Sequence, residues 1–318
     1  MFLNNENVLV MIREIINFMQ NVDSDLKNLA IKPKDGLHII LKTKMEGDEC
    51  IIDFENLETP EVPKEDISSF MKKCIQFQSY SWTIDYEKKP YYQKCLDVPQ
   101  KGIHSISPFC FATKIKSLEG GEKYLSDVED NGYSVYQRAK RYFKNTEKFI
   151  DDKDIASYIN ALENFVSNKE KLHFFLNTIP EFKELKSEEY IIIYLDLGFD
   201  IYKEAYLKYL EDKIFCVATY NTKNDKVNPV FGLSSFLNSL NSLKPYLTHQ
   251  SATFEINNRI SVEDALHLSD FKNIAFLLPT PLPIFIFKEE LKKDIVSIFS
   301  EDAKNGKKRT YASIVEEL

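Results

Sequence analysis

The run Tyr-Ile-Ile-Ile-Tyr-Leu-Asp at residues 190–196 is the feature that most constrains what this chain can fold into. β-Branched and aromatic side chains fit a pleated surface, and an uninterrupted apolar run is typical of a strand buried on both faces. A helix is expected at residues 200–212 and a second strand at residues 214–220. Strand, helix and strand at this spacing are compatible with either a βαβ crossover or half of a ferredoxin-like fold.

The remaining elements follow from the spacing of apolar residues. Helices are expected where these residues recur every three to four positions, at residues 5–30, 68–77, 133–149 and 154–166. Strands are expected at residues 37–44, 49–54, 107–116 and 275–287, the first two joined as a hairpin through Gly47.

The predicted fold class is α+β: an irregular mixed domain with a strand-rich core flanked by helices. Because 318 residues exceed the usual single hydrophobic core, about two domains are expected. We place an N-terminal α+β part at residues 1–100 and the strand-rich core with helices at residues 101–318.

Glycine is scarce, with nine residues in the whole chain, and this argues against an enzyme built on glycine-rich phosphate loops. Neither G-x-G-x-x-G nor G-x-x-x-x-G-K-[ST] occurs. The five cysteines form no C-x-x-C pair, and the five histidines are isolated from one another. We therefore expect no zinc site and no cofactor.

The cellular setting expected from the sequence is the cytoplasm, without membrane attachment. An odd number of cysteines suits a reducing compartment, and residues 1–20 carry too many polar side chains for a signal peptide. The longest apolar run, residues 274–287, is interrupted by prolines and is too short to span a bilayer.

A net charge of −8 argues against a free-standing nucleic-acid binder, although one basic patch could still contact a phosphate backbone. The clearest patch lies in residues 138–148, where five basic residues stand against one acid. The candidates are Arg138, Lys140, Arg141 and Lys144, with Tyr133, Tyr136 and Tyr142 interleaved. A basic helix with aromatic residues can follow a backbone and stack bases, and an ordinary solvated helix face gives the same pattern.

A second candidate is the segment 236–250, in which leucines alternate with polar side chains suited to recognition. These side chains are Asn238, Asn241, Lys244, Tyr246 and His249. Asparagine can read a base edge and lysine can hold a phosphate. A polar loop ahead of a turn at Pro245 explains the same residues.

Asp196 and Asp200 flank the end of the expected strand at residues 190–196, a common location for catalytic or metal-binding carboxylates. The same pair is typical of a strand-to-helix turn in which Asp200 caps the helix. No nucleophile elbow or H-E-x-x-H motif accompanies them.

Four stretches together resemble the large subunit of type I-B CRISPR effector complexes (Cascade), a Csh-type CRISPR-associated protein. They include Ser107-Pro-Phe-Cys-Phe-Ala-Thr-Lys114, the strand and Tyr-rich helix at residues 194–210, Asn241-Ser-Leu-Lys-Pro-Tyr-Leu-Thr-His249, and residues 260–286 ending in Leu278-Pro-Thr-Pro-Leu-Pro-Ile-Phe-Ile286. The resemblance covers about residues 100–290.

The resemblance implies a non-catalytic antiviral-defence subunit that binds the 5′ handle of the CRISPR RNA and recognises the protospacer-adjacent motif (PAM) of double-stranded target DNA. Its partners would be the handle-capping and backbone Cascade subunits and the helicase-nuclease. Guide pairing reads most of the target sequence in such machines, so a few amide and cationic side chains suffice for the motif. Asn238, Asn241 and Lys244 are the expected readers, and the same segment is also a candidate for holding the RNA handle.

One departure from the family pattern is that the helical C-terminal domain is expected to be absent, because the chain ends near the last matching motif. Two other functions remain open at this point. One is a metal-dependent hydrolase that uses Asp196, Asp200 and either His249 or His267. The other is a protein-interaction scaffold without nucleic-acid contact.

Overall fold

In the computed structural model the chain divides into two compact units, and each unit is made of segments that are separated in the sequence. The structure describes residues 13, 15–22, 27, 31–47, 49–82, 95–97, 102–120, 134–150, 153–215, 222–223, 230–233, 259–274, 301 and 304–306. The first unit comprises Met1–Lys32, Asp85–Lys88 and Ile214–Leu318, and the second comprises Pro33–Ile84 and Lys89–Lys213. The boundary expected near residue 100 falls inside the second unit, because strands from both sides of that position pair with each other.

The second unit is built on a four-stranded mixed sheet with the order β2-β1-β4-β3. The strands are β1 (Gly36–Glu46), β2 (Glu49–Asp53), β3 (Cys110–Lys114) and β4 (Tyr190–Leu195). β1 runs parallel to β4, whereas β2 and β3 run antiparallel to their neighbours. Tyr194 lies opposite Ile40 of β1 and Cys110 of β3, so β4 is a central strand.

β4 is buried along its length after Tyr190, which confirms the buried strand expected from its sequence. Phe77 of α3 (Ser69–Ser79) stacks on Tyr194 with a centroid separation of 5.7 Å. Phe77 also packs at 4.6 Å on Tyr202 of α9 (Phe199–Lys213). The Tyr202 hydroxyl donates to the Leu195 carbonyl at 2.8 Å, so α9 is anchored to the end of the strand from which it emerges.

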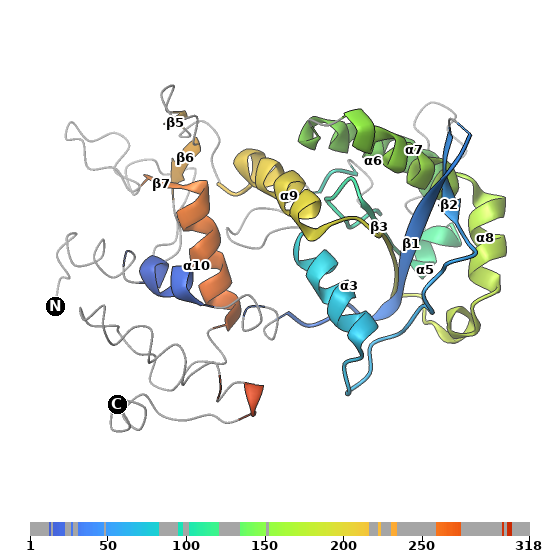
Figure 1. Ribbon diagram of the computed structural model, residues 1–318, viewed down its shortest axis with the longest axis horizontal. Helices are drawn as coiled ribbons and strands as arrows, with labels where there is room; N and C mark the ends of the chain where they lie inside the picture. Colours follow the sequence, from blue (N-terminus) through green and yellow to red (C-terminus); the bar gives the residue numbers. More distant parts are fainter. Residues whose placement is uncertain are drawn as a thin grey trace. The chain divides into compact units, whose positions relative to one another are not determined.

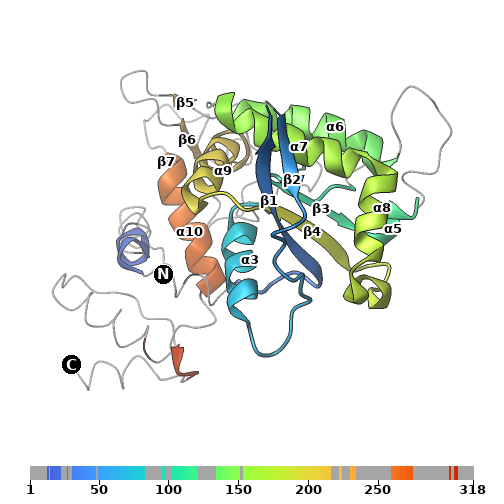
Figure 2. The same cartoon turned by 45° about the vertical axis from the view of Figure 1, so that its right-hand side comes forward.

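Helices cover both faces of this sheet. The others in the second unit are α5 (Ile115–Leu118), α6 (Val135–Thr146), α7 (Lys153–Ser167) and α8 (Lys169–Asn177), with the short 3₁₀ helices η1 (Glu147–Phe149) and η2 (Pro180–Glu184). α7 packs against β2 and is flanked by α6 and α8. Both views show α3 on one side of β1 and α8 on the other (Figures 1 and 2).

The hairpin of β1 and β2 turns through Gly47, whose φ of 64° is a left-handed conformation that suits glycine. At the other end of β1, Gly36 has a φ of 137° and pairs with Tyr190. A Cβ atom at residue 36 would overlap the Tyr190 backbone. The parallel pairing of β1 with β4 therefore begins at a position where only glycine fits.

In the first unit, the described residues include a three-stranded antiparallel sheet, a helical stretch at residues 15–21 and the longer helix α10. The strands are β5 (Thr222–Lys223), β6 (Val230–Leu233) and β7 (Arg259–Ser261), in the order β5-β6-β7, and the helix α10 (Val262–Ile274) follows β7 directly. Phe271 of α10 packs edge-to-face on Phe18 at 6.5 Å.

The α+β class is confirmed, and so are the hairpin and the helices expected near residues 68–77, 133–149, 154–166 and 200–212. The sequence did not predict the helix α8 or the short strand β5. The strand expected at residues 214–220 is not seen at Ile214 and Phe215, and its remaining residues lie outside the described ones, as do those at 275–287. No helix in the described part of the chain is long and apolar enough to cross a membrane.

Candidate nucleic-acid interface

α6 is a strongly two-faced helix, and its exposed side carries most of the basic residues expected to bind nucleic acid. Ser134 caps its first turn, accepting a hydrogen bond from the Gln137 amide at 3.2 Å. The inward face is apolar and aromatic and consists of Val135, Tyr136, Ala139, Tyr142 and Phe143. The outward face continues into η1, and its exposed cations are Lys140, Arg141, Lys144 and Lys148. We call these four residues the basic face.

The spacing of the basic face explains how its charges gather. Positions three and four residues apart lie on the same side of a helix, so Lys140, Arg141 and Lys144 project together. Glu147 is the one carboxylate among the exposed residues of α6 and η1. Glu163 of α7 lies nearby; its burial raises the pKa of that carboxyl, and Lys140 opposes the shift. The chemistry available here is attraction of an extended anion rather than bond breaking.

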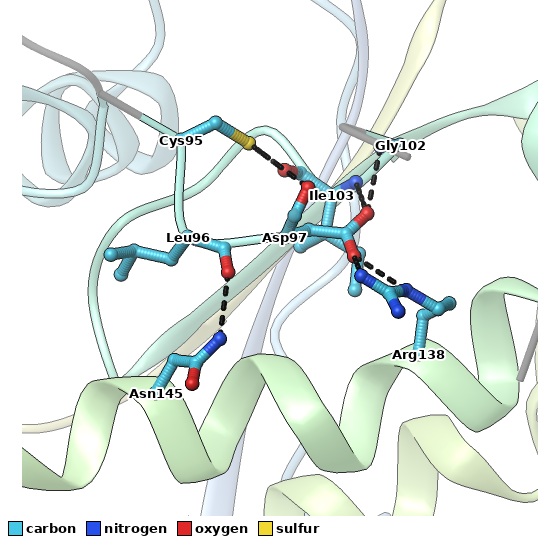
Figure 3. Close-up of polar contacts among 7 residues, drawn as sticks. All are labelled: Cys95, Leu96, Asp97, Gly102, Ile103, Arg138 and Asn145. Atoms are coloured by element: carbon cyan, nitrogen blue, oxygen red, sulfur yellow. Dashed lines mark hydrogen bonds and ion pairs between the residues drawn. The ribbon is translucent and has the colours of Figure 1, made fainter. Parts of the chain in front are cut away.

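Arg138 does not belong to this face, which corrects the prediction that it contacts nucleic acid. Its side chain is 1% exposed and forms an ion pair with Asp97, whose carboxylate is fully buried. Figure 3 shows the guanidinium reaching from α6 to this carboxylate. A buried, paired guanidinium is not available to a phosphate group.

Asp97 uses both carboxylate oxygens. Oδ1 accepts from Arg138 Nε and lies equally close to Nη2, each at 2.8 Å. Oδ2 accepts from the Gly102 amide at 2.8 Å and the Ile103 amide at 3.1 Å. Asn145 Nδ2, two turns further along α6, donates to the Leu96 carbonyl at 2.9 Å (Figure 3). α6 therefore holds the described residues of the 95–103 region against the sheet.

The tyrosines of α6, Tyr136 and Tyr142, are also buried, which corrects the expectation that they stack bases. The Tyr142 hydroxyl donates to the Ser107 carbonyl at 2.7 Å and to the Cys110 carbonyl at 3.0 Å. The Tyr136 hydroxyl lies 2.5 Å from His173 Nε2 and 3.2 Å from the Leu118 carbonyl. Tyr133 lies outside the described residues.

The second candidate segment lies outside the described residues as a whole. Its members are Asn238, Asn241, Lys244, Tyr246 and His249. Their part in recognition remains a prediction from the sequence.

The carboxylates after β4 have partners that fit a structural role. Asp196 Oδ1 lies 2.9 Å from Lys73 Nζ, and the same ammonium group lies 3.1 Å from Glu58. Asp200 lies in the first turn of α9, which begins at Phe199, so it is not the capping residue that the sequence predicted. There it is close to the positive end of the helix dipole.

The histidines expected to join a hydrolytic site are His267 and His249. His267 belongs to α10 in the first unit, with Nε2 4.0 Å from Glu263, and Asp196 and Asp200 belong to the second. His249 lies outside the described residues. Among the residues that the structure describes, no three His, Cys, Asp or Glu side chains come together as metal ligands would.

No family model, no curated protein and no solved structure matches this chain. The basic face of α6 therefore stands on its own geometry. Sequence periodicity predicted the helix, and three of the four predicted cations lie on its basic face. It gave no signal for the Asp97–Arg138 pair, because the two residues are 41 positions apart and no local pattern connects them.

Proposed function

We propose that this chain is the non-catalytic large subunit of a type I-B CRISPR surveillance complex, acting in the cytoplasm on nucleic acid. The observation that carries the proposal is the basic face: four exposed cations on one side of α6 and η1 in a protein whose net charge is −8. Clustering of cations against such a background favours one dedicated contact with a phosphate backbone.

The charge balance also favours a subunit over an independent binder. Each cation that neutralises a phosphate releases a counterion, so three or four contacts give only weak, salt-sensitive binding by themselves. Partner subunits that hold the CRISPR RNA would supply the rest of the affinity. The proposed ligands are the region of the RNA 5′ handle and the double-stranded target near its PAM.

Motif reading is assigned in this proposal to Asn238, Asn241 and Lys244, with Tyr246 and His249 beside them. Asparagine pairs with an adenine edge in the major groove or with an acceptor in the minor groove, and lysine holds a phosphate. The handle-capping and backbone subunits and the helicase-nuclease are the expected partners.

The test is affinity purification of the tagged chain from its own cells, followed by analysis of the bound nucleic acid. We expect a complex of several proteins with RNA of discrete length that contains repeat sequence. Recovery of the chain without RNA, or with other proteins only, would contradict the proposal and favour an interaction scaffold.

A pair of charge-reversal variants then tests the basic face within that complex. Lys140→Glu with Lys144→Glu is expected to reduce target-DNA or RNA retention at least tenfold. The control is Lys72→Glu with Lys203→Glu, which makes the same charge change at exposed positions of α3 and α9. Equal losses in both variants would show that net charge alone is responsible.

The motif-reading segment is tested separately with Asn241→Ala combined with Lys244→Ala. We expect weaker binding of DNA that carries the PAM and little change for DNA without it. Equal binding by wild type and variant across all motifs and salt concentrations would remove this assignment while leaving the basic face untouched.

A further inference from the structure

Three aromatic side chains meet at the end of the sheet where β4 begins. Trp82 contacts Tyr190 edge-to-face with centroids 5.4 Å apart, and His104 contacts the same tyrosine edge-to-face at 5.1 Å. All three residues are only partly buried. We call Trp82, His104 and Tyr190 the aromatic platform.

Lysines surround the aromatic platform. Lys34 Nζ lies 5.2 Å from the centroid of the Trp82 ring, and Lys114 Nζ lies 5.4 Å from that of Tyr190. Lys116, exposed on α5, shares the carboxylate of Glu188 with Lys114, at 2.6 Å and 2.7 Å respectively. These two hydrogen bonds lower the pKa of Glu188 to about 2, so the carboxylate is ionised and partly neutralises both lysines.

Backbone hydrogen bonds fix the positions from which the platform projects. The Tyr190 amide donates to the Asp35 carbonyl at 3.0 Å, and the His104 amide donates to the Ala112 carbonyl at 2.7 Å. Trp82 forms an isolated bridge with Ser105. The backbone positions that carry the rings are therefore fixed before any ligand arrives, which lowers the entropy lost on binding.

Core packing alone does not account for this arrangement. Tyr142, Tyr194, Tyr202 and Tyr209 are fully buried in the same protein, so its interior accepts large aromatic rings. The platform instead keeps its rings at the surface and places ammonium groups over them. Partly exposed aromatic rings with adjacent cations are the combination that binds the bases and phosphates of single-stranded nucleic acid.

We propose that the aromatic platform binds an unpaired stretch of nucleic acid, with a base stacked on Trp82 or Tyr190 and a neighbouring phosphate held by Lys34 and Lys114. The lysine ammonium groups leave the ring faces for the phosphate as the base takes their place. This inference rests on the proposed function for its class of ligand, and it adds a second contact that involves none of the four residues of the basic face.

Trp82 is the sole tryptophan of the chain, so its fluorescence reports on this site without a label. The experiment titrates the purified chain with single-stranded oligothymidylate of about ten nucleotides, a length within the range bound by single nucleic-acid-binding domains. We expect saturable quenching by the single strand and at least tenfold weaker quenching by a duplex of the same length. Absence of quenching by the single strand up to millimolar concentration, or equal quenching by the duplex, overturns the inference.

Variants at the platform separate stacking from charge. Tyr190→Leu, and Lys34→Ala combined with Lys114→Ala, are each expected to weaken the quenching titration about tenfold. Glu188→Gln is expected to strengthen it at least twofold by releasing Lys114 and Lys116, a gain that misfolding does not produce. The matched control is Glu204→Gln, an equal charge change at an exposed position of α9, which should leave the titration unchanged.

The basic-face variant Lys140→Glu with Lys144→Glu distinguishes this inference from the proposed function. We expect it to leave Trp82 quenching within twofold of wild type, even where it abolishes nucleic-acid retention by the complex. Suppose that nucleic-acid retention by the complex depends on the basic face, while single strands do not quench Trp82. This result would contradict the further inference and leave the proposed function intact. Quenching caused by a partner protein but not by oligonucleotides would likewise reassign the platform to protein binding.

Discussion

Arg138 and Asp97 form an ion pair in the interior of the second unit, with Arg138 Nη2 2.8 Å from Asp97 Oδ1 and neither side chain more than 1% exposed. The pair joins α6 to the described residues around 95–103, which lie beside the sheet. The carboxylate also accepts hydrogen bonds from two backbone amides, so both of its oxygens have hydrogen-bond partners. Losing either partner leaves the other charge buried and unmatched.

Replacing Arg138 with methionine is expected to destabilise the protein by about 3–5 kcal/mol, the usual effect of removing one partner of a buried pair. Chemical denaturation followed by circular dichroism measures this. Arg141→Met is the matched control, since Arg141 is exposed on the same helix, and its change should stay within about 0.5 kcal/mol. Equal effects of the two substitutions would contradict the structural role of Arg138.

Gly36→Ala is expected to destabilise the second unit by on the order of 3 kcal/mol, because a Cβ atom would overlap the Tyr190 backbone at a φ of 137°. Gly198→Ala, where a Cβ atom meets nothing within 4 Å, should change stability by no more than about 0.5 kcal/mol. The measurement is the shift in denaturation midpoint for each variant. A Gly36→Ala protein as stable as wild type would show that β1 does not pair with β4 as described.

His38 is expected to make the protein less stable in mild acid. It is fully buried, with Nε2 2.9 Å from the Lys34 carbonyl, and burial lowers its pKa from 6.5 to about 4. Between these pH values the unfolded chain binds a proton that the folded chain does not, so stability falls as the pH drops from 6.5 to 4. The full effect is on the order of 3 kcal/mol.

The check on His38 is the pH dependence of the free energy of unfolding in a His38→Gln variant. Glutamine keeps an N–H donor for the Lys34 carbonyl and does not titrate, so the loss of stability between pH 6.5 and 4 should become smaller. His173→Gln is the comparison, because His173 is only partly buried; desolvation and the nearby Lys169 lower its pKa. An unchanged profile for His38→Gln would mean that burial does not lower the pKa of this imidazole in the folded protein.

Salt dependence offers a quantitative test of the basic face. Each neutralised phosphate contributes a slope of about −0.7 to −0.9 to the plot of log affinity against log salt concentration. Lys140→Ala with Lys144→Ala should therefore make the slope for the assembled complex shallower by about 1.5. An unaltered slope would show that these lysines do not contact phosphate groups.

Local patterns predicted the elements of this protein well wherever a single periodicity was strong. The apolar run of β4, the hairpin through Gly47 and the two-faced sequence of α6 each appear as expected. α8 was missed because a short helix of nine residues gives little periodic signal. The domain boundary was misplaced because a parallel strand pair joins segments that are far apart in the sequence.

The sequence by itself determined that α6 is a helix with an aromatic side and a basic side, because that information repeats every three to four residues. Only the tertiary structure decided that Arg138 points inward while Arg141 stays in solvent, since the choice depends on a carboxylate at Asp97. The aromatic platform likewise draws Trp82, His104 and Tyr190 from three separate segments. Contacts of this kind arise from sheet pairing and helix packing between distant segments, and no local spacing encodes them.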